Sequence, residues 1–154
     1  MKHKQNSIHI LLAEDDEDDE FLFKELITHL SVSTFLITVQ DGEKLMNVLS
    51  TYPTIPPPHL IFLDINMPRK NGLECLTEIR SHKRYDNTPV FMFSTSQDEG
   101  SVNKAYEIGA NLYIPKSQFF SGEKDIIEQL FSMHWKEYIS KLPRDQFIFG
   151  KVAV

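Results

Sequence analysis

The sequence contains only one cysteine, Cys75, and this scarcity excludes several classes of protein. One thiol cannot build a disulfide framework or a cysteine-rich zinc site, so we expect a reducing, cytoplasmic setting. No stretch approaches the roughly 20 apolar residues that span a bilayer. The basic start MKHKQNS lacks the apolar core of a secretory signal. We therefore expect a soluble protein without membrane contact.

Basic residues are too few and too scattered for a nucleic-acid-binding surface. The 154 residues include 16 Lys and Arg against 22 Asp and Glu, which gives a net charge of −6. The consecutive acids from Glu14 to Glu20 account for this excess, because the other 15 acidic residues nearly balance the basic ones. Direct DNA binding is therefore not expected. The acidity is local and indicates a site rather than a polyanionic surface.

The rest of the chain alternates short apolar runs with amphipathic segments. Runs such as HLIFLD, apolar on successive residues, are typical of strands that are covered on both faces. Strands that alternate with helices predict right-handed crossovers and a parallel sheet. We therefore predict a doubly wound, five-stranded α/β fold. The predicted strands are residues 8–13, 34–40, 59–64, 89–94 and 112–114, and the predicted helices are 20–30, 41–50, 72–82, 98–109 and a long 121–142.

Polar side chains stand where the predicted strands end, the edge at which such folds form their sites. Glu14 and Asp15 follow the first strand, Asp64 the third and Ser94 the fourth, while the fifth runs into Lys116. Two carboxylates about 4 Å apart repel by about 4 kcal/mol at an effective dielectric constant near 20. Such a cluster favours a hard divalent cation, and oxygen ligands favour Mg²⁺. Lysine adds a positive charge for phosphoryl oxygens.

The remaining acids of the run, from Asp16 to Glu20, precede and begin the first predicted helix. Negative charge is favourable there, because the first amide groups of a helix are unpaired and its dipole is positive. The run thus divides into a metal site and a helix start. An alternative is that Asp15 and Asp16, rather than Glu14 and Asp15, form the working pair.

Four sequence elements occur in the order ILLAED, LIFLDINMPRKNG, PVFMFST and YIPK. In this order and spacing they resemble a response-regulator receiver domain over about residues 7–140. The segments MPRKNG and STS, the prolines before the third strand and the short chain are similar to the phytochrome-associated subtype. The resemblance implies a flavodoxin-like (βα)5 fold in residues 1–141 with an extended C-terminal helix. Residues 142–154 would form a tail, with no output domain.

The resemblance also implies a phosphoacceptor function with Mg²⁺ as cofactor. Asp64 would accept a phosphoryl group from a sensor histidine kinase, for which a phytochrome is one candidate. Asp15, Asp64 and the carbonyl group of Asn66 would ligate Mg²⁺, and Glu14 would act through bound water. Lys116 would pair with the phosphoryl group. The protein would be a signalling switch rather than an enzyme.

The family resemblance gives further residues a part in switching. Ser94 would bond a phosphoryl oxygen and draw in the loop that follows it, and Tyr113 would then change rotamer. The face made by the fourth helix, fifth strand and fifth helix would carry the output. Asn66 and Ser96 occupy positions where the family tunes the lifetime of the phosphorylated state.

Two positions depart from the usual pattern of the family. Proline usually follows the lysine in a cis peptide, whereas here Pro115 precedes Lys116, so a cis bond at Lys116–Ser117 would have no proline to support it. Ser94 replaces the more frequent threonine and keeps the hydroxyl group.

The long last helix is apolar on more than one face, and the end of the chain, QFIFGKVAV, is apolar as well. A helix that packs on a sheet needs only one apolar stripe. We therefore predict a homodimer through the C-terminal helix and tail, with a tail folded over its own domain as the alternative.

Two other functions remain open from the sequence. One is a Mg²⁺-dependent phosphohydrolase with an aspartyl-phosphate intermediate. That class often carries a second acid two residues after its nucleophile, where this chain has Asn66. The other is a docking module that is never phosphorylated.

Overall fold

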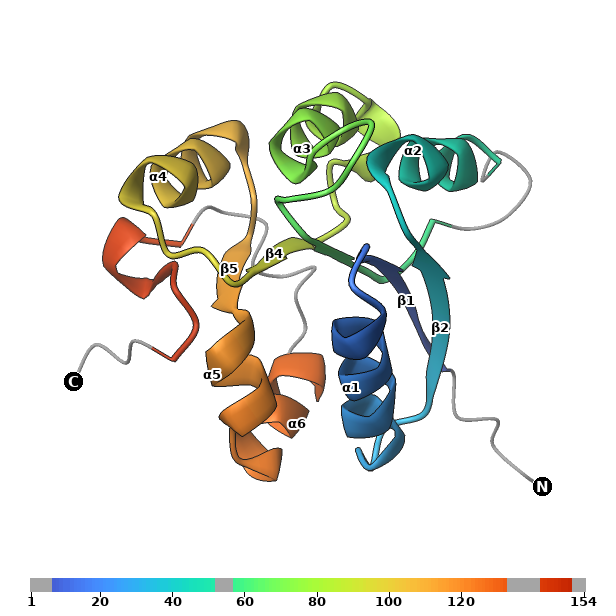
Figure 1. The fold of residues 1–154 in the computed structure, drawn as a ribbon, viewed down its shortest axis with the longest axis vertical. Coiled ribbons are helices and arrows are strands. Elements are labelled where there is room, and N and C mark those ends of the chain that lie inside the picture. Colours follow the sequence, from blue (N-terminus) through green and yellow to red (C-terminus); the bar gives the residue numbers. More distant parts are fainter. Residues whose placement is uncertain (1–6, 52–56, 133–141, 151–154) are drawn as a thin grey trace.

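A five-stranded parallel sheet runs through the centre of the computed structural model, which describes residues 7–51, 57–132 and 142–150 (Figure 1). Its strands lie in the order β2-β1-β3-β4-β5, and every pair of neighbours is parallel. This confirms the predicted sheet. The strands are β1 (Ile8–Ala13), β2 (Thr34–Val39), β3 (Leu60–Leu63), β4 (Val90–Ser94) and β5 (Leu112–Pro115).

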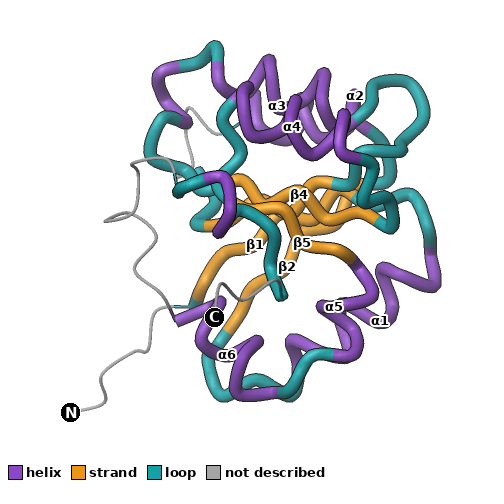
Figure 2. Tube along the Cα trace, turned by 90° about the vertical axis from the view of Figure 1, so that its left-hand side faces the viewer, coloured by secondary structure: helices purple, strands orange, loops and turns teal. Residues whose placement is uncertain are grey.

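Helices cover both faces of the sheet, as a doubly wound fold requires (Figure 2). On one face lie α2 (Gly42–Ser50), α3 (Gly72–Arg80) and α4 (Glu99–Ile108). On the other face lie α1 (Glu17–Thr28), α5 (Lys116–Ser121) and α6 (Lys124–Ser132). Two 3₁₀ turns, η1 (Lys83–Tyr85) and η3 (Arg144–Gln146), complete the described elements.

The two faces of the sheet bury different kinds of side chain. Alternate residues of β3 point to opposite faces, so Ile61 and Leu63 join one core while Leu60 and Phe62 join the other. The core beneath α2, α3 and α4 is mostly aliphatic. The core beneath α1, α5 and α6 is rich in phenylalanine: Phe23, Phe62, Phe91, Phe93, Phe119 and Phe131.

The helices begin at the side chains that the sequence favours. The Asp16 carboxylate accepts hydrogen bonds from the backbone N–H groups of Asp18 (2.8 Å) and Asp19 (3.1 Å) and caps α1. Asp41 caps α2 in the same way, and Asn71 forms a capping box with Glu74 at α3. The role of the acidic run as a helix start is thereby confirmed.

The prediction of one long helix over residues 121–142 was wrong at its start. A short helix, α5, begins directly at Lys116, and the chain becomes extended at Gly122 before α6 begins at Lys124. A glycine lowers helix stability, which favours a break at this place. Residues 133–141 lie outside the described part of the chain.

The C-terminal segment, residues 142–150, lies along the outer edge of β5. The N–H of Tyr113 donates to the carbonyl of Phe147 (3.0 Å), and the N–H of Phe149 donates to the carbonyl of Tyr113 (2.8 Å). The hydroxyl of Tyr106 in α4 donates to the carbonyl of Leu142 (2.6 Å). Phe147 is fully buried in the aliphatic core. The described part of the tail thus packs on its own domain.

Candidate functional site

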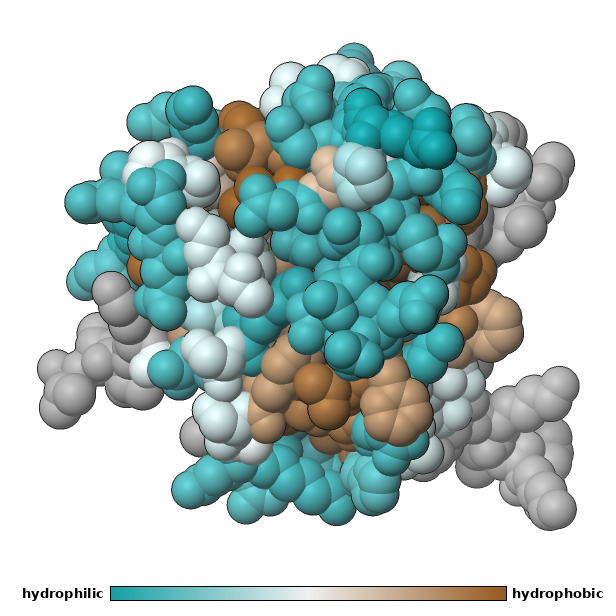
Figure 3. All heavy atoms as spheres, in the orientation of Figure 1, coloured by the Kyte–Doolittle hydropathy of each residue, from teal (hydrophilic) through white to brown (hydrophobic). Residues whose placement is uncertain are grey.

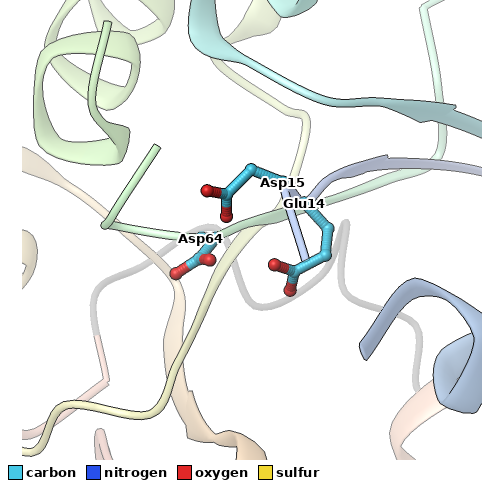
Figure 4. Close-up of side chains that lie close together, drawn as sticks. All are labelled: Glu14, Asp15 and Asp64. Atoms are coloured by element: carbon cyan, nitrogen blue, oxygen red, sulfur yellow. The ribbon is translucent and has the colours of Figure 1, made fainter. Parts of the chain in front are cut away.

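Three carboxylates meet where β1 and β3 end, as the sequence predicts. Glu14, Asp15 and Asp64 each place one oxygen within 4.8 Å of the others (Figure 4). Backbone pairing holds them there, since the N–H of Asp64 donates to the carbonyl of Ala13 at 3.1 Å. Gly72 packs against this turn so closely that a Cβ there would lie 2.2 Å from the carbonyl oxygen of Asp64. The sequence motif DINMPRKNG therefore needs its glycine.

Two of the three carboxylates are buried, and burial disfavours their charged forms. Glu14 is 1% exposed and Asp64 4%, whereas Asp15 is exposed. Burial raises the pKa of Glu14 to about 8, even though the Lys116 ammonium group opposes this shift. Burial also raises the pKa of Asp64, against the opposing charge of Lys116. Ionising both buried carboxyl groups is therefore unfavourable unless further positive charge lies among them.

The Lys116 ammonium group lies within this cluster, at the first residue of α5. Its Nζ atom is 2.7 Å from Glu14 Oε1, 2.8 Å from Asp19 Oδ2 and 3.3 Å from Asp64 Oδ2. Burial alone would lower the pKa of Lys116, but the close contacts of its ammonium group with the Asp19 and Glu14 carboxylates raise it above its usual value. The lysine thus stays charged, and the prediction that it lies opposite the carboxylates is confirmed.

The set of donor atoms fits a hard divalent cation. All three candidate ligands offer carboxylate oxygens, which suit Mg²⁺ or Mn²⁺. Within the described part of the chain, Glu14 Oε1 is a buried oxygen without a well-aligned hydrogen bond, although the Lys116 ammonium group lies near it. The N–H of Asn66 donates to Asp64 Oδ1 at 3.3 Å. The part of the Asn66 carbonyl group as a metal ligand remains a prediction.

The predicted switch residues form a chain of hydrogen bonds after β4. Ser94 is buried at the end of that strand, and its hydroxyl oxygen accepts from the N–H of Ser96 at 3.2 Å. The Tyr113 hydroxyl donates to the carbonyl of Ser96 at 2.5 Å. Tyr113 is fully buried, so its ring lies inward beneath this loop. The structure thus joins Ser94, Ser96 and Tyr113, while their roles in switching remain predictions.

The unusual order of proline and lysine has a simple structural result. Pro115 ends β5 and precedes the first turn of α5, a position that suits its fixed φ. The described residues contain no cis peptide bond, and the Lys116–Ser117 bond is therefore trans. The Lys116 side chain therefore reaches the carboxylates from a trans backbone.

Sequence reasoning missed the contact of Asp19 with Lys116. Asp19 lies in the first turn of α1, beside the metal cluster but outside the three carboxylates that compose it. In a run of seven acids no residue type distinguishes one acid from the next. The only available signal was its position in the first helical turn, next to a strand end.

Comparisons with known proteins agree with this site. The sequence profile described as "Response regulator receiver domain" matches residues 10–130. Response regulator Rcp1 of Synechocystis sp. is 37% identical over 112 residues, which cover 71% of this chain and 76% of Rcp1. CpxR of Klebsiella pneumoniae is 31% identical over 133 residues, and the matched region spans about half (51%) of that longer protein.

Two solved structures are similar over most of both chains. The phosphorylated cyanobacterial phytochrome response regulator RcpA has a TM-score of 0.74 and 32% identity, covering 90% of this chain and 99% of RcpA. The Mn²⁺-bound form of Rcp1 has a TM-score of 0.69 and 33% identity, covering 88% and 99%. These relatives confirm the resemblance to the phytochrome-associated subtype.

Within the described residues no helix is long and apolar enough to cross a membrane. The fold, the acidic cluster, the buried lysine and the matching profile agree with one another. This chain belongs to the response regulator receiver domains, the phosphoacceptor components of two-component signal transduction.

Proposed function

We propose that Asp64 is the phosphoacceptor of this chain and that a sensor histidine kinase is the donor. The observation that carries the proposal is the position of Asp64 between a lysine and two other acids. Lys116 Nζ lies 3.3 Å from Asp64 Oδ2, and oxygens of Glu14 and Asp15 lie within 4.8 Å of an Asp64 oxygen. A carboxylate beside a fixed positive charge and a cation site is suited to phosphoryl transfer.

The proposed reaction uses the Asp64 carboxylate as nucleophile. One oxygen attacks the phosphorus of a phosphohistidine, a P–O bond forms, and the P–N bond breaks while the imidazole nitrogen keeps the electron pair. Hydrolysis then reverses the modification, because water attacks phosphorus, the P–O bond to Asp64 breaks, and the carboxylate and inorganic phosphate are released. In both steps Lys116 orients the phosphoryl oxygens and balances their charge.

Glu14, Asp15 and Asp64 would hold the divalent cation, with the carbonyl group of Asn66 as the remaining proposed ligand. Bound there, Mg²⁺ supplies positive charge that offsets the repulsion between the carboxylates and the phosphoryl oxygens. The Mn²⁺ in the similar Rcp1 structure supports a divalent cation, and the all-oxygen ligand set supports Mg²⁺.

We propose that the phosphorylated site signals through Ser94 and Tyr113. A phosphoryl oxygen that bonds the Ser94 hydroxyl would pull on the loop that Ser96 shares with Tyr113. Asn66 and Ser96 would set the lifetime of the phosphorylated state. The face of α4, β5 and α5 would change with this loop, because Tyr113 belongs to β5 and this strand contacts α4 and α5.

An exposed apolar surface beside the site is suited to the kinase. Phe21 is 61% exposed and Leu22 45%, and both lie on α1, which begins next to the acidic cluster. Figure 3 shows a hydrophobic patch in the lower half of an otherwise mostly hydrophilic face, the region where Figure 1 places α1 and α5. Exposed apolar patches mark interaction sites. The similarity to RcpA makes a phytochrome the first candidate for the kinase.

We also propose a homodimer through the C-terminal helix and tail. Ile127, Leu130 and Phe131 of α6 are buried in their own domain, whereas Trp135, Tyr138 and Ile139 of the same apolar sequence lie outside the described residues. The C-terminal segment pairs with an edge strand, and the same backbone bonds could be made to β5 of a second copy. Sedimentation that shows only monomer at tens of micromolar, with and without beryllofluoride, would remove this proposal.

Acetyl phosphate and intact-mass measurement test the proposed function. With Mg²⁺ the wild-type chain should gain one phosphoryl group, and the gain should disappear when EDTA removes the metal. Failure of the wild-type chain to gain mass would favour the docking module. Repeated turnover of p-nitrophenyl phosphate would favour the phosphohydrolase, against our proposal of a signalling switch.

A further inference from the structure

Among the described residues, three carboxylates contact Lys116, and Asp19 is the one that lies outside the proposed metal cluster. It lies on the first turn of α1, and its Oδ2 atom is 2.8 Å from Lys116 Nζ in an ion pair with hydrogen-bond geometry. The lysine is buried, while the Asp19 side chain is 22% exposed. The contact therefore ties the amino end of α1 to the amino end of α5 across the site.

The lysine donates hydrogen bonds to Asp19 and Asp64 and lies 2.7 Å from Glu14 Oε1 in an ion pair. An ammonium group has three N–H bonds, and three carboxylate oxygens surround Lys116 Nζ, from Glu14, Asp19 and Asp64. A phosphoryl group on Asp64 can take over the contact that Asp64 itself makes. A second contact to the phosphoryl group must compete with Glu14 and Asp19 for the ammonium group.

The charge of Asp19 also acts on the phosphoryl group. Asp19 Oδ2 and Asp64 Oδ2 lie 2.8 and 3.3 Å from the same nitrogen, so the two oxygens are at most about 6 Å apart. At this distance like charges still repel appreciably in a partly buried site. A cation held by Glu14, Asp15 and Asp64 offsets the charge of those ligands, but Asp19 is not one of them.

We propose that Asp19 is a positioning residue that holds the Lys116 ammonium group toward α1 and thereby weakens the binding of a phosphoryl group at Asp64. The inference depends on the proposed phosphoacceptor function and adds to it a side chain, Asp19, that restrains the Lys116 ammonium group. The site would then exchange its phosphoryl group more readily than one in which the lysine is free to turn toward Asp64.

Beryllofluoride, an analogue of the phosphoryl group, provides the test. Its affinity at saturating Mg²⁺ is measured by ¹⁹F NMR titration for the wild type, Asp19→Asn and Asp18→Asn. Asp18 is the matched control, because it is an exposed acid in the same helical turn, whereas the lysine pairs with Glu14, Asp19 and Asp64. Both variants lose one charge near the positive end of the helix dipole.

Asp19→Asn should bind beryllofluoride roughly three- to tenfold more tightly than the wild type, as expected for a charge about 6 Å away at an effective dielectric constant of about 40 to 80 in a partly solvated site. Asp18→Asn should stay within about twofold, since its charge is exposed to solvent and screened. The ammonium ¹⁵N resonance of Lys116 should shift in Asp19→Asn and not in Asp18→Asn. A purely structural role of Asp19 would weaken binding rather than strengthen it.

Equal affinities for Asp19→Asn and Asp18→Asn, or weaker binding by Asp19→Asn, would overturn the inference while the phosphoacceptor function stands. Failure of the wild-type chain to bind beryllofluoride would overturn the proposed function, and the role of Asp19 with it. Metal-free thermal unfolding of all three proteins shows whether each variant is folded in the titration.

Discussion

The acidic edge of the sheet and the C-terminal segment are held in place by different kinds of interaction. At the acidic edge, side chains make the contacts, since Lys116 reaches Glu14, Asp19 and Asp64. On β5, backbone groups make them, through two hydrogen bonds between Tyr113 and the C-terminal segment. Side-chain chemistry depends on residue type, so the sequence indicated most of the acidic edge. The backbone pairing of the C-terminal segment is open to almost any residue, so the sequence did not indicate its place on β5.

Tyr113 connects the two regions. Its backbone pairs with the C-terminal segment, its ring lies 6.3 Å from that of Phe147, and its hydroxyl donates to the carbonyl of Ser96. A change in the loop after β4 therefore reaches the residue on which the C-terminal segment is anchored. Variants in the acidic edge and in the C-terminal segment can therefore separate effects on phosphorylation from effects on the free energy of unfolding.

The largest expected effect is the loss of phosphorylation in Asp64→Asn. The variant should show no gain of mass with acetyl phosphate and Mg²⁺, because the nucleophilic oxygen is gone. Its metal-free unfolding midpoint should not fall, since burial raises the pKa of Asp64 and an ionised carboxylate there is unfavourable at pH 7. Residual uptake by this variant would place the acceptor elsewhere.

Phe147→Ala should produce the opposite result, a large loss of stability with phosphorylation retained. Phe147 is fully buried, and removing such a ring costs about 3–5 kcal/mol of unfolding free energy. Urea unfolding measures the loss, with the exposed Phe21→Ala as control, expected to change stability by about 0.5 kcal/mol or less. A loss of stability no larger than that of the control would show that the C-terminal segment adds nothing to the folded core.

Mg²⁺ should stabilise the acidic edge and leave the C-terminal segment unaffected. A ligand that binds only the folded state adds about 2.7 kcal/mol at one hundred times its dissociation constant. Thermal unfolding of the wild type should shift upward with Mg²⁺ and back with EDTA, and Asp15→Asn should reduce the shift. An equal shift in both proteins would exclude Asp15 as a ligand.

The smallest effect is expected for the two tyrosine hydroxyl groups. Tyr113→Phe removes the hydrogen bond to Ser96, and Tyr106→Phe removes the one to Leu142. Each should cost about 1 kcal/mol of unfolding free energy. Only Tyr113→Phe should also change the rate at which the phosphorylated form decays, as followed by intact mass. A change of that rate in Tyr106→Phe alone would break the proposed link through Tyr113.

Much of the fold and the site follows from local sequence. The apolar runs predict the strands because both faces of the sheet are covered, and the strand ends predict Glu14, Asp15, Asp64 and Lys116 because parallel strands present their carboxyl ends at one edge. The helix starts at Asp41 and Asn71 follow from side-chain capping. Each of these features depends on residue type at a known spacing.

The features that could not be predicted depend on tertiary packing, which brings one of several similar residues or surfaces into contact. Asp19 is one acid among seven, and only the packing of α1 against α5 selects it as the partner of Lys116. The break at Gly122 interrupts a continuous helical pattern. The C-terminal segment could have turned toward several apolar surfaces before Phe147 entered the aliphatic core.

Mapping the phosphorylated residue tests the central claim most directly. Borohydride reduces an aspartyl phosphate to homoserine, which peptide mass analysis can locate after treatment with acetyl phosphate and Mg²⁺. The account predicts homoserine at position 64 and at no other acid of the chain. Homoserine at position 15 or 16, or phosphate on a serine instead, would contradict it.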